Sequence, residues 1–95
     1  MPINGGNVEI IVRKPTESEK IAMKSNPTWG CGVSEFNWHY DETETSLIIE
    51  GEVEVSYRSG SAAVKFGAGD FVVFPQGLSC VWKVIKPVKK HYSFG

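Results

Sequence analysis

The feature that most constrains this chain is a strict alternation of side-chain types that begins in residues 32–51 (GVSEFNWHYDETETSLIIEG). In the range 36–40, a strand sends the three aromatic side chains to one face and the asparagine and histidine to the other. Gly51 suits a tight bend between strands, and residues 52–58 beyond it again alternate apolar with polar side chains. This pattern predicts half-buried antiparallel strands, with the aromatic rings facing inward.

Further short runs of apolar or alternating residues are separated by glycine and proline throughout the chain. Pro15 ends the first run, Gly60 supplies a hairpin turn in residues 58–61, and Pro87 breaks the last two runs apart. About seven or eight short strands with such turns predict an all-β sandwich or closed barrel. Besides the strands already described, we expect strands at residues 8–13, 62–66, 71–74, 80–85 and 88–94.

One short helix is expected near the N-terminus. Thr16 and Glu19 match the capping-box pattern, in which the first side chain caps the helix and the second reaches back to the cap. The helix would therefore span residues 16–24, and residues 25–27 (Ser-Asn-Pro) would end it. No other helix is predicted.

Composition excludes several classes of protein. Ninety-five residues favour one domain, 1–95, with a modest core. A net charge of -1 argues against nucleic acid as a partner. No apolar run approaches the roughly 20 residues that span a bilayer, and the N-terminus lacks a basic region followed by an apolar one, so we expect no membrane partner and a cytoplasmic location. Cys31 and Cys80 are expected to be free thiols, although a single bridge between them stays open.

Two segments carry a spacing that resembles a known family. Residues 32–51 resemble the first cupin motif, G(X)5HXH(X)3E(X)6G, with its fixed positions at Gly32, Trp38, Tyr40, Glu44 and Gly51. Residues 69–80 are similar to the second motif, G(X)5PXG(X)2H, with fixed positions at Gly69, Pro75, Gly77 and Cys80. The surrounding residues are similar to small single-domain cupins of the ureidoglycine aminohydrolase and ethanolamine-utilisation branch. The resemblance implies a jelly-roll barrel (a double-stranded β-helix), commonly a homodimer, with a pocket at one end.

The chain departs from the cupin pattern at the metal ligands. Metal-binding cupins hold manganese, iron, zinc or nickel with three histidines and a glutamate, and the matching positions here are Trp38, Tyr40, Glu44 and Cys80. An indole nitrogen has no lone pair to offer, and a phenol binds well only after losing a proton near pH ~10. His39 lies nearby but faces away by alternation. We therefore expect no catalytic metal at this position and no cofactor.

The expected binding site is an aromatic, weakly polar pocket at the barrel mouth, lined by Trp38, Tyr40, Glu44, Cys80 and Trp82. Its rings would form the walls, and Glu44 and Tyr40 would orient a small molecule. Alternatively, the aromatic residues simply fill the barrel. Glu44 is the best candidate for a general acid or base, with Tyr40 as its hydrogen-bond partner, because a carboxylate among rings must find a donor or raise its pKa. The alternative role of Glu44 is a structural hydrogen bond, for example to Tyr40.

For the remaining reactive or aromatic residues, the sequence predicts structural roles. Cys80 would need a positive neighbour to act as a nucleophile, so a small buried apolar role is favoured. Trp29 is expected to be a lid or core plug near the pocket, or a subunit contact, and His91 to be structural or at a subunit contact. The basic residues near the C-terminus are too sparse for a nucleic-acid site: Lys83, Lys86, Lys89 and Lys90.

Three functions remain open from the sequence. The first is a metal-independent module that binds a small, partly apolar organic ligand in the barrel mouth. The second is an enzyme that acts on a small nitrogenous or carbonyl compound, with Glu44 as acid or base. The third is a structural or accessory subunit whose pocket is vestigial.

Overall fold

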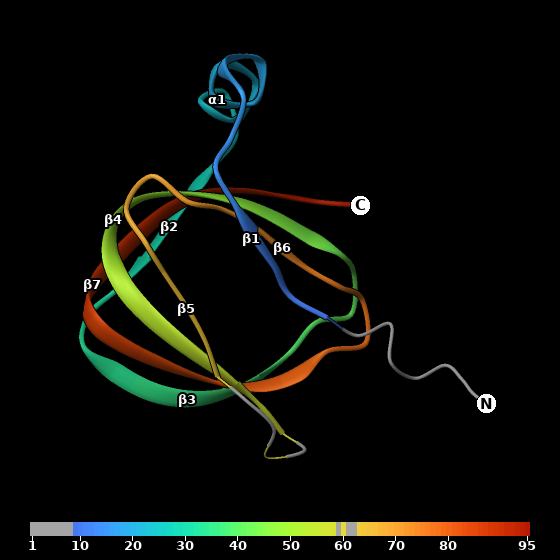
Figure 1. The fold of residues 1–95 in the computed structure, drawn as a ribbon, viewed down its shortest axis with the longest axis vertical. Helices are drawn as coiled ribbons and strands as arrows, with labels where there is room; N and C mark the ends of the chain where they lie inside the picture. Colours follow the sequence, from blue (N-terminus) through green and yellow to red (C-terminus); the bar gives the residue numbers. More distant parts are fainter. Residues whose placement is uncertain (1–8, 59, 61–62) are drawn as a thin grey trace.

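A computed structural model describes residues 9–58, 60 and 63–95 of the chain. Within these ranges there are seven strands and one short helix (Figure 1). In chain order the elements are β1 (Ile11–Arg13), α1 (Glu17–Met23), β2 (Thr28–Cys31), β3 (Ser34–His39), β4 (Glu44–Tyr57), β5 (Ala63–Gly67), β6 (Phe71–Phe74) and β7 (Ser79–Phe94). All strand pairings are antiparallel.

Two long strands, β4 and β7, pair with each other and organise the barrel. The first part of β4 pairs with β6, and its later part pairs with β5. Likewise, the first part of β7 pairs with β3, and its later part pairs with β2. Each long strand therefore contributes to both walls, and the chain closes around one interior, as Figure 1 shows. The predicted all-β jelly-roll barrel with one short helix is confirmed.

Both long strands continue through residues that were expected to interrupt them. Gly51 was predicted to be a bend between strands and Pro87 to be a break, and both predictions were wrong. The pairing of β4 with β7 instead shifts register around Gly51, which has φ 104° and lies against the backbone of Pro87 and Val88. A side chain at Gly51 would overlap that backbone.

The irregularity at Gly51 reverses the phase of β4. Before it, the even-numbered Glu44, Ser46 and Ile48 are buried in the barrel, whereas after it the odd-numbered Val53 and Val55 are buried. An irregularity that adds one residue to one strand changes which side chains face inward. This shift is what brings Glu44 to the interior, which simple alternation counted back from Val53 does not predict.

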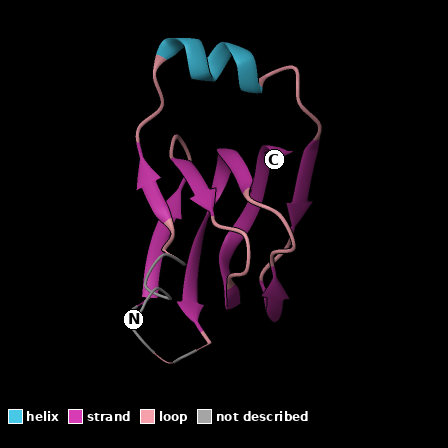
Figure 2. Ribbon diagram, turned by 90° about the vertical axis from the view of Figure 1, so that its right-hand side faces the viewer, coloured by secondary structure: helices cyan, strands magenta, loops and turns pink. Residues whose placement is uncertain are grey.

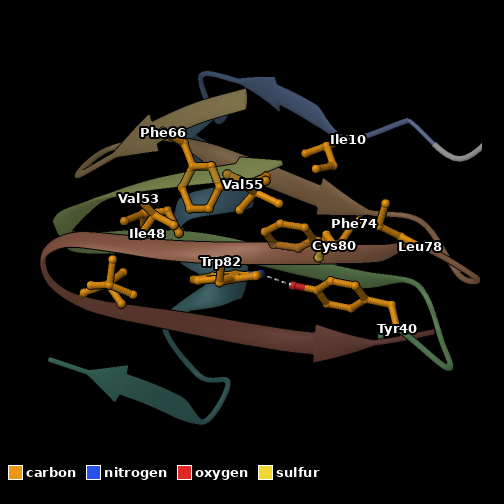
Figure 3. Packing of buried hydrophobic residues seen from close by; sticks show 13 residues of the cluster. Ile10, Tyr40, Ile48, Val53, Val55, Phe66, Phe74, Leu78, Cys80 and Trp82 are labelled. Carbon is orange, nitrogen blue, oxygen red and sulfur yellow. Dashed lines mark hydrogen bonds between the residues drawn. The ribbon is translucent and has the colours of Figure 1, made fainter. Parts of the chain in front are cut away.

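The barrel core is built around stacked and edge-on aromatic rings. Phe74 stacks on Tyr40 with ring centroids 4.8 Å apart, and it also contacts Trp82 and Phe66 at 5.7 and 5.8 Å (Figure 3). Such pairs contribute about 0.5–1.5 kcal/mol each beyond the burial of apolar area. Because these rings come from both walls, they hold the two walls of the barrel together.

The helix lies outside the barrel (Figure 2), and its predicted cap is confirmed. The Glu19 amide donates to Thr16 Oγ1 at 3.1 Å, and the Thr16 amide donates to Glu19 Oε1 at 2.8 Å. Met23 packs with Leu47 and Phe71 in a second apolar cluster, which is why Leu47 is buried although its neighbours face the interior. In the described part of the chain, no helix is long and apolar enough to cross a membrane.

Element boundaries differ from the predictions in several places. Strand β1 begins at Ile11, and Val8 lies outside the described residues. Ala62 and the hairpin residues 59 and 61 also lie outside them, while Gly60 has the positive φ, 85°, that a tight turn requires. Strand β2 was not predicted, because a four-residue segment that contains a glycine shows no alternation; its pairing with residues 88–91 of β7 defines it.

Candidate functional site

A cavity of about 260 Å³ lies among strands β2, β3, β4 and β7, and aromatic rings form most of its wall. Seven aromatic side chains, one carboxylate and one ammonium group border it: Trp29, Phe36, Trp38, Tyr40, Glu44, Trp82, Lys90, Tyr92 and Phe94. Trp82, 2% exposed, forms part of the buried inner wall, and Trp38, 51% exposed, lies at the rim. All three tryptophans of the chain border this cavity.

Alternation along two strands supplies most of the wall. Strand β3 contributes Phe36 and Trp38, and strand β7 contributes four residues in the same phase: Trp82, Lys90, Tyr92 and Phe94. Tyr40 follows β3 and is fixed by two backbone hydrogen bonds, from its own amide to Leu78 at 2.9 Å and to its carbonyl from Gly77 at 2.8 Å. The cavity wall is therefore built largely on regular, hydrogen-bonded backbone.

A buried ion pair lies in the cavity wall between Lys90 of β7 and Glu44 of β4. Each residue is only 5% exposed. Ser46 Oγ donates a second hydrogen bond to Glu44 Oε2 at 2.7 Å, and the Lys90 ammonium lies 4.8 Å from the centre of a Trp82 ring. Burial lowers the pKa of Lys90 from its ordinary value, and the neighbouring Glu44 opposes that change. The pair thus combines a charge-assisted hydrogen bond with a cation–π contact.

Tyr40 is held as a neutral phenol beside this pair. The Trp82 indole N–H donates to the Tyr40 hydroxyl oxygen at 3.1 Å (Figure 3). Burial, together with the nearby Glu44, raises the pKa of Tyr40 far above its ordinary value of 10.0. Tyr40 is therefore a hydrogen-bond donor at neutral pH and not a base.

Glu44 does not form the hydrogen bond to Tyr40 that the sequence analysis considered for it. Among the described residues, its side chain bonds to Lys90 and Ser46, and no bond joins it to Tyr40. Glu44 nevertheless borders the cavity together with Tyr40. A carboxylate that contacts a buried amine and also borders the cavity can exchange a proton with the amine or with a molecule in the cavity.

Of the five residues predicted to line the pocket, the structure brings four together around the cavity: Trp38, Tyr40, Glu44 and Trp82. The fifth, Cys80, is fully buried in the apolar core, and its Sγ is 3.7 Å from the Trp38 carbonyl oxygen. Burial raises the pKa of the Cys80 thiol to about 11, so the thiol stays protonated at neutral pH. The structure thus places Cys80 in the buried apolar role rather than in the cavity wall.

Lys90 borders the cavity but was not among the residues predicted for the site, because the sequence grouped it with the lysines of a basic tail. Counting every second residue from Trp82 along β7 reaches Lys90, although Lys86 in the same count is exposed, so alternation is only a partial signal. It was lost because Pro87 was expected to break the strand. Pro87 instead continues in phase, and Lys83, Lys86 and Lys89 are exposed while Lys90 is buried.

The two histidines lie away from the cavity. His39 is exposed, and its Nδ1 is 2.7 Å from Ser79 Oγ. His91 Nδ1 donates to the Asn26 carbonyl at 3.0 Å, which ties β7 to the segment between α1 and β2. Trp29, expected near the pocket, packs edge-on against Trp82 with centroids 5.9 Å apart.

The cavity residues do not fit a transition metal. Glu44 is already bonded to an ammonium and a hydroxyl, the Tyr40 oxygen already accepts a hydrogen bond, and Cys80 lies in the core. Across the described ranges, no three histidine, cysteine, aspartate or glutamate side chains gather as a ligand set. A positive charge already lies beside the one carboxylate, and a divalent cation would have to displace it.

Comparison with known proteins identifies the family. A family model described as an EutQ-like cupin domain matches residues 18–92. The chain belongs to the EutQ-like cupins. A crystal structure of a DUF861 family protein from Thermotoga maritima is similar to it, with a TM-score of 0.86 and 43% identity over 92% of this chain and 100% of that one. No curated protein of similar sequence was found.

More distant structures share the fold of this EutQ-like cupin. A putative ethanolamine utilization protein Q from Salmonella typhimurium has a TM-score of 0.63 and 24% identity, over 70% of this chain and 53% of that chain. A DUF861 family protein of unknown function from Pseudomonas syringae also has a TM-score of 0.63, with 29% identity over 72% of this chain and 29% of that one. These longer chains contain the barrel as one part of their length.

Proposed function

We propose that this EutQ-like cupin binds a small, partly aromatic organic molecule in the barrel mouth. One observation carries the proposal: an aromatic cavity that contains a buried acid–base pair. Protein pockets for small ligands are concave, mostly apolar and equipped with a few converging polar groups. The cavity has this composition. Its charged groups lie on the regular strands β4 and β7, and the backbone of Tyr40 is fixed by hydrogen bonds at its amide and its carbonyl.

The size and chemistry of the cavity narrow the class of ligand. Its volume of about 260 Å³ lies just below the ~300–1,000 Å³ of typical ligand pockets, which favours a molecule with a single ring or a short chain. The rings of Trp29 and Trp38 offer apolar and edge-on contacts. Glu44 and Lys90 offer an acceptor and a donor to one polar head group.

Tryptophan fluorescence tests the proposal directly, because every tryptophan of the chain borders the cavity. Single-ring compounds with one polar substituent, such as benzyl alcohol, benzylamine and benzoate, would be titrated into the protein. We expect a saturable change in emission with at least one of them. Trp38→Ala removes a rim ring that is half exposed, so it should weaken the affinity while leaving the fold intact.

A matched control is Ile85→Ala, since Ile85 is also a partly exposed residue of the barrel but does not border the cavity. Its affinity should equal that of the unchanged protein. If none of the compounds changes the emission, or if both variants weaken binding equally, the barrel mouth is not the binding site.

A second candidate function is an enzyme acting on a small carbonyl or nitrogenous compound. The observation that favours it is the contact between Glu44 and the Lys90 amine inside the cavity wall. Glu44→Gln keeps the size of the side chain and removes its ability to take up a proton. In an enzyme of this kind it should abolish turnover while near-ultraviolet circular dichroism stays unchanged; retained turnover would exclude Glu44 as acid or base.

A further inference from the structure

Lys90 differs from every other lysine of the chain in its surroundings. Its ammonium lies within 5.3 Å of the ring centres of Trp29, Phe74 and Trp82. Its side chain is 6% exposed and borders the aromatic cavity. Burial leaves this amine less well hydrated than one at the surface, which favours its neutral, nucleophilic form, whereas Glu44 and the ring faces favour its charged form.

We propose that Lys90 is a nucleophile that forms a reversible imine with a small aldehyde or ketone bound in the cavity, with Glu44 as the proton carrier. This inference rests on the proposed function, since the carbonyl compound is the small molecule that the barrel mouth takes up. It adds a covalent step and names the reacting atom, Lys90 Nζ. The preferred reactant is an aldehyde carrying one ring or a short apolar chain.

The step balances without any oxidant or cofactor. Lys90 first passes a proton to Glu44, with which it is directly bonded, and becomes a neutral amine. Its nitrogen lone pair then forms a C–N bond to the carbonyl carbon as the C=O π bond breaks, and the carbonyl oxygen takes that proton from Glu44 to give a hydroxyl group. The adduct nitrogen then gives a second proton to Glu44, which passes it to the hydroxyl group; water leaves as the nitrogen lone pair forms the C=N bond, giving a protonated imine. One aldehyde and one ammonium group thus give one iminium group and one water.

The geometry supplies what this step needs. The nucleophile and the proton carrier are already in hydrogen-bond contact, and Ser46 fixes the carboxylate from its other side at 2.7 Å. Tyr40 borders the same cavity as a neutral phenol and can donate to the carbonyl oxygen. The surrounding rings limit the water that would reverse the reaction.

The other lysines of the chain serve as an internal control for selective reaction at Lys90. It has seven further lysines, and the adjacent Lys89 is exposed on the other face of the same strand. Water strongly hydrates the ammonium group of a surface lysine. A labelling experiment that resolves Lys90 from Lys89 therefore separates the effect of the cavity from the general reactivity of lysine.

The test is reductive trapping with benzaldehyde and sodium cyanoborohydride at neutral pH, followed by intact-mass and peptide mass spectrometry. We expect one benzyl group per chain, located at Lys90, with labelling at least about tenfold faster than at Lys89. Benzyl alcohol, which has the same ring but cannot form an imine, should slow the labelling by competition. Glu44→Gln should slow it by about a hundredfold or more, as removal of a general acid–base group does.

Lys90→Arg keeps a positive charge opposite Glu44 and cannot form an imine, so it should abolish the rapid labelling while circular dichroism stays unchanged. Lys89→Arg should label at the unchanged rate. If Lys90→Arg does not fold, the benzyl alcohol competition and the site of labelling in the unchanged protein still decide the matter.

The outcomes separate the two proposals. Equal labelling of all lysines, or benzyl alcohol binding without labelling at Lys90, overturns the imine inference; in the second case the binding function stands. Absence of both benzyl alcohol binding and labelling at Lys90 overturns both. Rapid labelling at Lys90 that benzyl alcohol suppresses supports both.

Discussion

Two ion pairs in this protein have short contacts but opposite surroundings. Arg13 and Glu19 form a bidentate pair at 2.8 and 2.6 Å on the surface, next to the cap of α1. Lys90 and Glu44 form a pair inside the barrel, with both side chains 6% exposed. The surface pair remains surrounded by water and salt, whereas the buried pair lies among aromatic rings.

The difference in surroundings decides which of the two pairs fits the proposed function. A surface pair contributes little, because water and salt screen it, and its Glu19 also serves the helix cap. A buried pair costs desolvation free energy that its attraction offsets only in part, so apolar residues of the same size would often serve stability as well. Because its burial brings little net stability, we infer that the Glu44–Lys90 pair serves the proposed chemistry of the cavity more than the stability of the barrel.

The largest expected effect follows from breaking the buried pair on one side. Lys90→Met leaves the Glu44 carboxylate buried without its counter-ion, and should lower the free energy of unfolding by about 3–5 kcal/mol in urea denaturation. Lys89→Met, at the exposed neighbouring position, should change it by less than about 0.5 kcal/mol. Equal effects of the two changes would show that the burial of Lys90 has no energetic consequence.

A double substitution sharpens the same comparison. Glu44→Leu together with Lys90→Met replaces both charges with apolar groups of similar size, and should restore most of the stability that Lys90→Met loses. The same protein should no longer bind a polar single-ring ligand. A double variant less stable than Lys90→Met alone would mean that the pair stabilises the barrel, contrary to our inference.

Removing the second partner of Glu44 should have a smaller effect. Ser46→Ala deletes a buried hydrogen bond to a charged group and should cost about 1.5–3 kcal/mol by the same measurement. Ser56→Ala on the same strand, at a partly exposed position, serves as the control. Loss of less than about 0.5 kcal/mol at Ser46 would contradict a tightly held carboxylate.

Removing the helix cap should lower the free energy of unfolding by less than the loss of the Ser46 hydrogen bond does. Thr16→Ala removes the side chain that accepts from the Glu19 amide and should cost about 1 kcal/mol. Thermal unfolding followed by circular dichroism measures this change. Thr16→Ser, which keeps the hydroxyl group, should stay close to the unchanged protein, and a loss as large as that of Thr16→Ala would contradict the capping role.

The surface pair should show the smallest effect, and it should appear mainly as a dependence on pH and salt. Hydrogen bonds from Arg13 and from the Thr16 amide lower the pKa of Glu19 from 4.5 to about 2. A carboxyl group with a lowered folded-state pKa contributes stability above its ordinary pKa, and this contribution disappears as the pH falls from about 4.5 to about 2. Arg13→Gln should reduce this acid-dependent loss, and 1 M salt, with a Debye length of about 3 Å, should make the two proteins more alike. Identical pH profiles at low salt would contradict the assignment.

The sequence predicts the aromatic residues of the cavity wall better than it predicts the buried ion pair. Period-two alternation and motif spacing are local signals, and they single out Trp38, Tyr40 and Trp82, which all border the cavity; Tyr40 and Trp82 are buried, whereas Trp38 is half exposed at the rim. The fold follows from the same alternation together with the glycine and proline turns. The capping box at Thr16 and Glu19 is equally local, and it predicts the helix to within about a residue at each end.

The parts that the sequence does not predict depend on pairing between distant segments. Gly51 and Pro87 resemble interruptions in sequence, yet the contact between their backbones lets both long strands continue. The inward position of Lys90 depends on that continuity, and its partner Glu44 is 46 residues away. Cys80 occupies a motif position, but the packing of the core, and not the spacing, decides that it lies away from the cavity.

The measurement that tests the central claim most directly is a proton–nitrogen NMR titration of the indole N–H groups with benzyl alcohol. The three tryptophans give three indole signals, and Trp29, Trp38 and Trp82 all border the cavity. We predict that all three signals shift with one common dissociation constant. In Lys90→Met, the affinity should fall while the signals stay dispersed. Indole signals that do not move, while backbone amides elsewhere on the barrel do, would contradict a binding site in the barrel mouth.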